Sequence, residues 1–254
     1  MIMRAFSRRR FLQMAGASAV AAAVPGLTEA EELWSSGSAT PTFKLPAGAV
    51  DCHMHIYDDR FPSAPGTTLR PPNASIEQYR KVQARLGMQR NVVVTPSTYG
   101  TDNRCTLDAL KRLGPNARGV AVVDTSVTQA QLAEMHAAGV RAIRFNLSYP
   151  GATTVDMLAP LASRIGALGW HIELVVQGAK LPALESHLLA LPCPLVIDHI
   201  AHVPQPGGMQ SDAMRTAQRL VDKGNTWITL SGPYVDSKAG APAYADVEPS
   251  GEGH

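Results

Sequence analysis

The chain has 254 residues, 45% of them hydrophobic, and its 23 basic residues nearly balance its 21 acidic ones. This composition is typical of a globular protein with one sizeable core and argues against a strongly charged, partner-seeking surface. No cluster of Lys and Arg follows the first ten residues, and no aromatic residues alternate with basic ones, so we do not expect nucleic-acid binding.

The N-terminal segment predicts an export signal rather than part of a fold. It has a basic start, an Ala-rich apolar stretch and a small-residue exit. Its "SRRRFLQ" resembles a twin-arginine signal, with Arg8 and Arg9 as the pair. We expect residues 1–30 to engage the twin-arginine export machinery and residues 31–48 to form a linker. The mature protein would then be periplasmic, without stable membrane association; the alternative is an N-terminal membrane anchor, which the short Ala-rich stretch disfavours.

From residue 49 onward, short β-branched runs alternate with segments whose apolar residues recur every three or four positions. The runs predict seven strands, at 49–56, 91–97, 118–125, 140–147, 171–177, 194–200 and 226–232. Between them we expect helices at 75–87, 103–114, 128–139, 154–169, 181–191 and 211–224. Such alternation is typical of βα units around a parallel sheet.

An α/β fold of the (β/α)8 TIM-barrel type is favoured over a doubly wound sheet, because no Gly-rich phosphate loop follows the first strand. Barrels of this type keep their sites at the carboxyl ends of the strands. Polar residues stand at those ends here: His53, His55, Ser97, Thr98, Asp124, Arg144, Asn146, Asp198, His199 and Ser231. No eighth strand follows residue 232, so we expect residues 49–254 to form an incomplete barrel with two unpaired edges.

The stretch "VDCHMHI" places His53 and His55 two residues apart on a predicted strand. Residues i and i+2 of a strand share a face, so both imidazoles can point into the barrel mouth. His199, at the end of the sixth predicted strand, would complete a cluster with them. The alternative is that the pair consists of two polar residues that close a strand.

Several segments together, "DCHMHI", "STYGTDNRCTLDAL", "AIRFNL", "PLVIDHIAHVPQP" and "TWITLSGPY", resemble the amidohydrolase superfamily. More narrowly, they are similar to its branch of 2-pyrone-4,6-dicarboxylate lactonase-like hydrolases. The resemblance implies a distorted (β/α)8 barrel that hydrolyses a lactone or amide. It also implies that His53, His55 and His199 are catalytic.

The family's catalytic Asp, at the end of the eighth strand, has no counterpart in this sequence. Asp246 and Glu248 follow the seventh strand and do not match its motif. We therefore expect a C-terminally truncated hydrolase that acts on a lactone of a small carboxylated compound. The alternatives are an inactive truncated product and a periplasmic small-molecule binding protein.

The resemblance leaves metal dependence open. Metal-dependent relatives add a His at the end of the fifth strand, where this chain has Gln177, and His171 begins that strand instead. Because the lactonase branch includes a metal-free site, we expect no cofactor and a histidine cluster that stabilises a developing oxyanion. If zinc is bound, its ligands would be His53, His55 and His199.

A carboxylated substrate needs cationic and hydroxyl donors around the same mouth. Arg144, at the end of the fourth predicted strand, is the candidate anchor, and Ser97, Thr98 and Tyr234 offer hydroxyls. The alternatives are an ion pair of Arg144 with a neighbour such as Asp124, and loop capping for the hydroxyl groups.

Overall fold

A computed structural model of the chain describes residues 41–205, 208–240 and 244–247. The predicted signal peptide, 1–30, and most of the predicted linker, 31–48, lie outside these residues. Within the described ranges, none of the helices is both long enough and apolar enough to cross a membrane.

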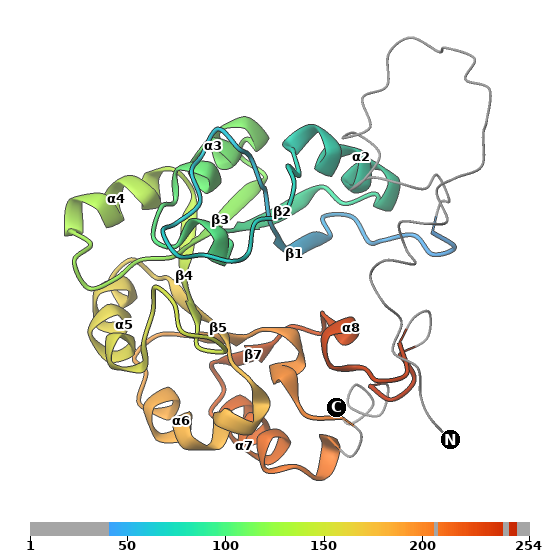
Figure 1. Cartoon of the computed structure of the whole chain (residues 1–254), viewed down its shortest axis with the longest axis vertical. Coiled ribbons are helices and arrows are strands. Elements are labelled where there is room, and N and C mark those ends of the chain that lie inside the picture. The colour runs from blue at the N-terminus through green and yellow to red at the C-terminus, as the bar shows by residue number, and fades with distance from the viewer. Residues whose placement is uncertain (1–40, 206–207, 241–243, 248–254) are drawn as a thin grey trace. The chain divides into compact units, whose positions relative to one another are not determined.

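The described residues contain one sheet of seven parallel strands, which follow one another in chain order from β1 to β7. The strands are β1 Val50–Met54, β2 Arg90–Val94, β3 Ala117–Ala121, β4 Val140–Asn146, β5 His171–Val175, β6 Leu195–Ile197 and β7 Thr226–Ile228. The sheet curls into an incomplete barrel whose first and last described strands are not paired with each other (Figure 1). All seven predicted strands and the incomplete barrel are thus confirmed.

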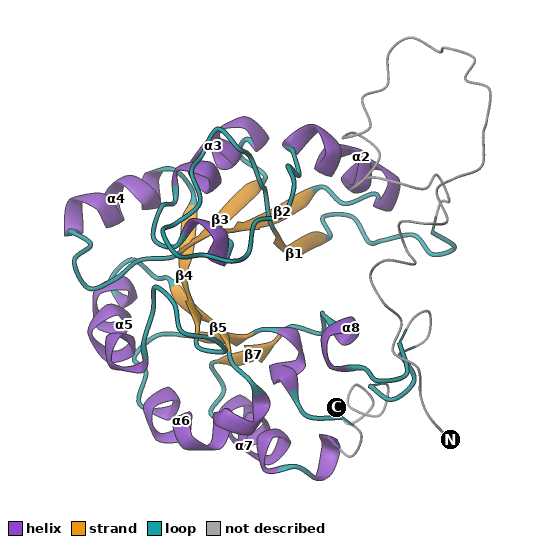
Figure 2. Cartoon of the chain, in the orientation of Figure 1, coloured by secondary structure: helices purple, strands orange, loops and turns teal. Residues whose placement is uncertain are grey.

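Helices surround the curled sheet on its outer side (Figure 2). They are α2 Ile76–Leu86, α3 Arg104–Leu113, α4 Gln129–Ala137, α5 Leu158–Gly166, α6 Leu181–Leu189 and α7 Asp212–Asp222. The short α8, Pro233–Asp236, follows β7 and contacts η4 instead. Short 3-10 helices are η1 Ser97–Tyr99, η2 Val155–Met157, η3 Gly178–Lys180, η4 His199–His202 and η5 Gly208–Gln210. Capping boxes begin α2 at Ser75 and α4 at Thr128, so local sequence fixes where these helices start.

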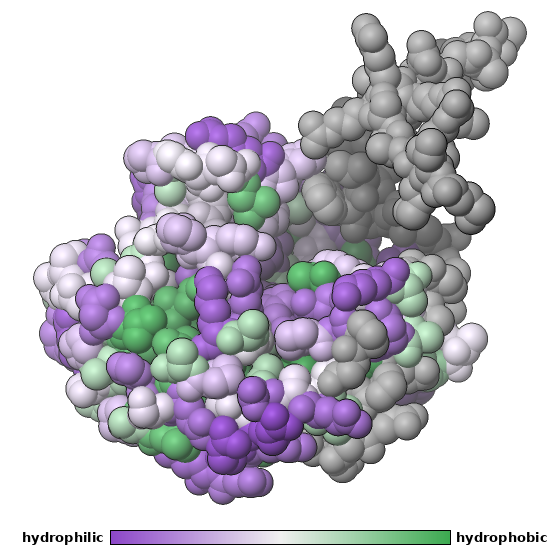
Figure 3. All heavy atoms as spheres, turned by 60° about the horizontal axis from the view of Figure 1, so that its bottom comes forward, coloured by the Kyte–Doolittle hydropathy of each residue, from purple (hydrophilic) through white to green (hydrophobic). Residues whose placement is uncertain are grey.

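The two faces of the sheet have different neighbours. Ile143 and Phe145 of β4 point outward into the main core, which the helices complete. Ala142 of the same strand points inward, where it packs with Val94 and Val120 in a small inner cluster. Figure 3 shows hydrophobic residues on the visible outer surface only in small groups among hydrophilic ones. The main core therefore lies between sheet and helices, and the inner face is free to carry polar groups.

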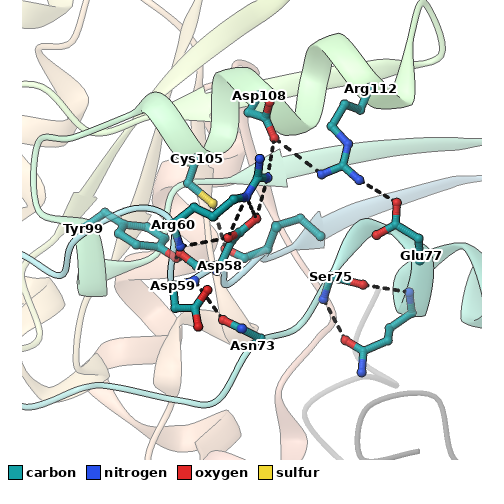
Figure 4. A network of polar contacts seen from close by, with 12 residues as sticks. Asp58, Asp59, Arg60, Asn73, Ser75, Glu77, Tyr99, Cys105, Asp108 and Arg112 are labelled. Carbon is teal, nitrogen blue, oxygen red and sulfur yellow. Dashed lines mark hydrogen bonds and ion pairs between the residues drawn. The ribbon is translucent and has the colours of Figure 1, made fainter. Parts of the chain in front are cut away.

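A polar network ties the segment after β1 to two helices (Figure 4). The guanidinium of Arg60 lies 2.6 Å from Asp58 and 3.1 Å from Asp108 of α3. Arg112 in turn contacts Asp108 at 3.5 Å and Glu77 of α2 at 2.5 Å. Exposed pairs of this kind contribute little to stability, because water and salt screen them. The network therefore orients the loop beside the carboxyl end of β1 more than it stabilises the fold.

Candidate functional site

The structure brings the three predicted catalytic histidines together. His53 lies in β1 and His55 directly follows that strand, on the same inward side. The ring centroid of His53 is 5.0 Å from that of His55 and 5.1 Å from that of His199, which begins η4 after β6. Two strand ends that are far apart in sequence thus supply one imidazole cluster.

The backbone that carries His199 has an unusual conformation. The residues of η4, His199 to His202, have φ angles of 54°, 53°, 54° and 44°, in the left-handed region. This region is costly for side chains with a Cβ and most of all for β-branched ones such as Ile200. The turn is held by Thr229, whose Oγ1 accepts the amide hydrogen of His199 at 2.9 Å and whose carbonyl accepts that of Ile200 at 2.9 Å. Local strain is therefore maintained where His199 is presented.

Buried charges lie beside the imidazoles. Arg144, Glu173 and Asp198 are only 6%, 3% and 0% exposed. The Nε atom of Arg144 is 3.5 Å from Glu173 Oε1 and 3.8 Å from Asp198 Oδ2. His53 Nδ1 lies 3.4 Å from Glu173 Oε1 and 3.5 Å from Asp198 Oδ1. One guanidinium thus faces two carboxyl groups, so a bound proton or cation is needed to balance their charge.

The pKa shifts follow from this burial. Burial, with Arg144 and His53 nearby, lowers the pKa of His55 to about 3. Burial also lowers the pKa of His199 to about 4, although Asp198 opposes the shift. Burial and the neighbouring Asp198 raise the pKa of Glu173 well above its usual range. At neutral pH both imidazoles are therefore uncharged, and of the two neighbouring acids Glu173 is the one that holds a proton more strongly.

For Asp198 the causes compete. Burial alone would raise the pKa of its carboxyl group, but the nearby His53 imidazole and the Arg144 guanidinium lower it below its usual value. Within the pair, Asp198 is thus the stronger acid and Glu173 the weaker one.

Hydrogen bonds fix two of the imidazole tautomers. His55 Nδ1 lies 2.7 Å from the carbonyl oxygen of Val94, so it carries the hydrogen and donates it. Ser231 Oγ donates to Thr229 Oγ1 at 3.2 Å, so His199 Nδ1, 3.0 Å away, must donate to Ser231. Both Nε2 atoms are therefore left with a lone pair.

The residues present fit a divalent metal ion. One ligand atom from each of His53, Asp198 and His199 can be chosen so that all lie within 4.8 Å of one another. Neither ring nitrogen of His53 and neither carboxylate oxygen of Asp198 has a hydrogen-bond partner among the described residues. Nitrogen and carboxylate donors are those that zinc prefers. The group shares two members with the zinc ligands considered from the sequence, and Asp198 stands where His55 was expected.

Sequence reasoning missed three residues of the site. Glu173 shares the inward face of β5 with His171 and Val175, so a charged residue in an otherwise apolar strand was the signal. Asp198 was noted as a polar strand end but was not placed in the cluster. Tyr57 continues the inward alternation of the histidine pair, and its ring lies beside that pair.

The acidic partners of Arg144 in the structure differ from the partner considered from the sequence, Asp124. Its ion-pair partners are Glu173 and Asp198, whereas Asp124 accepts hydrogen bonds from Ser126. The side chain is not wholly enclosed, since 7% of its surface is exposed although Nε is buried. Its remaining nitrogen atoms can therefore reach a ligand while Nε faces the acids.

The three predicted hydroxyl donors have different surroundings. Ser97 Oγ accepts a hydrogen bond from Asn146 Nδ2 at 3.0 Å, at the ends of β2 and β4. Thr98 is buried and donates to the carbonyl oxygen of Leu69 at 2.9 Å, as a loop-capping residue does. Tyr234, in α8, is 68% exposed. The side chains of Ser97 and Tyr234 thus remain accessible, whereas the hydroxyl group of Thr98 is already hydrogen-bonded to the backbone.

Two further features complete the surroundings of the cluster. His202 Nδ1 lies 2.9 Å from Asp236 Oδ2, which ties α8 to η4. A cavity of about 660 Å³ is lined by His53, Glu173 and Ser231, by other residues of β1 and β7, and by Val92, His171 and Val196. His55, Arg144 and His199 do not line it, so this cavity lies between the two edge strands and only borders the cluster.

Comparisons with known proteins agree with this geometry. Residues 50–250 match the sequence model of the amidohydrolase family. The 2-pyrone-4,6-dicarboxylate hydrolase of Comamonas testosteroni is 37% identical over 228 residues, which cover 85% of this chain and 75% of that protein. The 4-sulfomuconolactone hydrolase of Rhizobium radiobacter is 29% identical over 217 residues, which cover 84% of this chain and 72% of that protein.

A solved structure shares the fold. The crystal structure of an Agrobacterium tumefaciens protein in its apo form superposes with a TM-score of 0.77 at 29% identity, and the match covers 84% of this chain and 76% of that one. Family, fold and relatives thus agree, and they indicate an enzyme. The chain belongs to the amidohydrolase family.

Proposed function

We propose that the protein hydrolyses the ring ester of a small carboxylated lactone at the imidazole cluster. The observation that carries the proposal is the convergence of His53, Asp198 and His199. The buried donor atoms of His53 and Asp198 lack hydrogen-bond partners among the described residues. The names of the relatives support it, because both describe hydrolases of lactone-type compounds that carry acidic groups. No observation favours an inactive product or a binding protein.

In the proposed reaction, the oxygen of a water molecule bonds to the lactone carbonyl carbon, and the carbon–oxygen bond of the ring then breaks. The proton that water loses passes to the ring oxygen, which leaves as a hydroxyl group beside the new carboxyl group. A divalent ion, when bound, supplies Lewis-acid polarisation of a carbonyl oxygen. His53, Asp198 and His199 are the residues that would hold it.

The chain's own residues orient the substrate in this proposal. The guanidinium nitrogen atoms of Arg144 other than Nε bind a substrate carboxylate, because a guanidinium matches a carboxylate in bidentate geometry. Ser97 and Tyr234 are the accessible hydroxyl donors. His55 borders the cluster with its Nε2 lone pair.

The test is proton release by purified protein on a panel of lactones with and without carboxylates. Ring opening should release about one proton per turnover at neutral pH, and His53→Asn and His199→Asn should each lower kcat/KM by about 100-fold or more. His187→Asn, on the exposed face of α6, is the matched control and should change nothing. A wild-type protein inactive on the whole panel, or an active His53→Asn variant, would sink the proposal.

Export is a separate part of the proposal. The twin arginines Arg8 and Arg9 support delivery of the protein to the periplasm by the twin-arginine machinery. Replacement of both by Lys should retain the protein in the cytoplasmic fraction. Unchanged periplasmic recovery would contradict this part alone.

A further inference from the structure

We propose that Glu173 is a positioning residue, which holds the His53 ring in one tautomer and is itself held in place beside Arg144. This deepens the proposed lactone hydrolysis and rests on it for the activity readout only. The sequence pattern alone does not assign this positioning role to Glu173 or to Arg144.

Glu173 lies on the inward face of the sheet, one inward position beyond a row of apolar residues on the preceding strands. Val94, Val120 and Ala142 make up the inner cluster on β2, β3 and β4. Glu173 on β5 is 3% exposed, and its Oε1 has no hydrogen bond of ordinary length among the described residues. A buried polar group without a good partner destabilises a fold, so packing alone gives no reason for a carboxyl group here.

Glu173 Oε1 is aimed at two donors. His53 Nδ1 lies 3.4 Å away, at the outer limit of a hydrogen bond, and Arg144 Nε lies 3.5 Å away. Arg144 and Glu173 are direct partners in the register of β4 and β5, so the sheet itself fixes their approach. The carboxyl oxygen is thus held between the guanidinium and the imidazole.

This contact completes a pattern within the cluster. His55 directs Nδ1 at the Val94 carbonyl oxygen and His199 directs Nδ1 at Ser231. With Glu173 as the acceptor on its Nδ1 side, His53 also keeps its hydrogen on Nδ1 and its lone pair on Nε2. Asp198 lies almost as close, but it belongs to the candidate metal group, so Glu173 is the acceptor that remains when Asp198 binds a cation.

The decisive variants are Glu173→Met and Glu173→Gln. The Met side chain has a similar length but no acceptor oxygen, whereas Gln keeps a carbonyl oxygen in the same place. In both variants the guanidinium of Arg144 faces a single carboxyl group, that of Asp198, so the fold should be retained. We expect Glu173→Met to lower kcat by about tenfold or more with KM changed by no more than about twofold, and Glu173→Gln to restore most of kcat. Glu134→Met, exposed on α4, is the matched control.

A second readout does not need activity. Long-range proton–nitrogen correlation spectra, with His53→Asn used for assignment, report which nitrogen of His53 carries the hydrogen. Wild type and Glu173→Gln should show the Nδ1–H form, and Glu173→Met should show the Nε2–H form or a mixture. If Glu173→Met does not fold, Glu173→Asp withdraws the oxygen by one methylene and should give the same change.

The outcomes separate the two proposals. An unchanged His53 spectrum in Glu173→Met, a wild-type kcat in that variant, or an effect on KM alone would overturn the positioning role. If the spectrum changes as expected while wild type opens no lactone, then the proposed function fails and the positioning of His53 stands.

Discussion

The Nδ1 atoms of the three clustered imidazoles face acceptors of three kinds: a carbonyl oxygen beside His55, a hydroxyl beside His199 and carboxyl groups beside His53. The acceptors of His55 and His199 come from an adjacent strand or the segment after it, whereas those of His53 lie on β5 and directly after β6, which do not neighbour β1 in the sheet. The curled sheet therefore sets the ring orientations. The cluster therefore presents imidazoles whose orientations are directed by the fold, which suits them to bind a cation or accept a proton.

Ser231→Ala should weaken the site without unfolding the protein. The change removes the acceptor of His199 Nδ1, so the ring loses the hydrogen bond that fixes its tautomer. Loss of such a partner typically lowers metal affinity or activity by about 10- to 100-fold. Steady-state kinetics and zinc titration of the variant measure the effect. Ser163→Ala, which removes a hydroxyl bonded within α5, is the control; equal values for both variants would contradict the assignment.

Acid should destabilise the metal-free protein through His55. Its pKa is about 3 in the folded protein and about 6.5 in the unfolded chain, so the unfolded chain binds the proton first as pH falls. The contribution is complete above about pH 6.5 and is lost toward pH 3, with a slope of up to about 1.4 kcal/mol per pH unit. Urea unfolding of chelator-treated protein between pH 6.5 and 4.5 measures this slope.

The control for this titration compares slopes rather than absolute stabilities. His55→Asn lacks the group and should show a shallower acid dependence, whereas the exposed His187→Asn should match wild type. Identical slopes in His55→Asn and wild type would show that His55 does not carry the effect.

The sequence could predict the histidines but not the charges beside them. The spacing of His53 and His55 predicts their shared face, because alternation along a strand is a local property. Whether the acid that meets Arg144 is Asp124 or Glu173 depends on strand order and register, which are properties of the assembled sheet. For the same reason Asp198 was recognised as a strand end but not as a neighbour of His53.

At the scale of elements, η4 is the segment that local sequence describes least well. The strands and long helices follow from periodicity and caps, whereas four non-glycine residues in the left-handed region follow from contacts made elsewhere. Gly178 of η3 is one of those contacts, because its lack of a side chain lets η3 approach the turn. A Cβ there would lie 2.9 Å from the carbonyl carbon of His202 and closer still to its oxygen.

Gly178→Ala should therefore move η4 and the histidines that it carries. We expect a loss of about 1–3 kcal/mol in the free energy of unfolding and a lower kcat, because backbone atoms cannot yield as a flexible side chain can. Gly166→Ala in α5, where no atom lies within 4 Å, is the matched control and should leave stability equal or slightly higher. Urea unfolding and lactone turnover measure both variants. A fully stable and active Gly178→Ala protein would show that the close approach is unimportant.

At the scale of the whole described molecule, the site lies between a well-packed centre and two open sheet edges. β4 and β5 have strand neighbours on both sides, and their outward residues Phe145 and Ile172 are fully buried. β1 and β7 each pair with one strand of the described sheet, and Trp227 of β7 is 57% exposed. His53 lies on one edge strand, whereas Arg144 and Glu173 lie on the central pair, so the site joins regions of unequal packing.

Hydrogen exchange should reveal that gradient. Opening of an edge strand breaks hydrogen bonds to one neighbour and exposes little apolar surface, whereas opening of β4 or β5 disrupts the main core. Amides of β4 and β5 should thus exchange about 100-fold or more slowly than those of β7, with β1 intermediate because it has five residues and β7 has three. Exchange followed by mass spectrometry at two protein concentrations tests this. Protection of β7 equal to that of β5 would contradict the gradient; if it appeared only at the higher concentration, the open edge would be covered by a second molecule, as unpaired strands readily are.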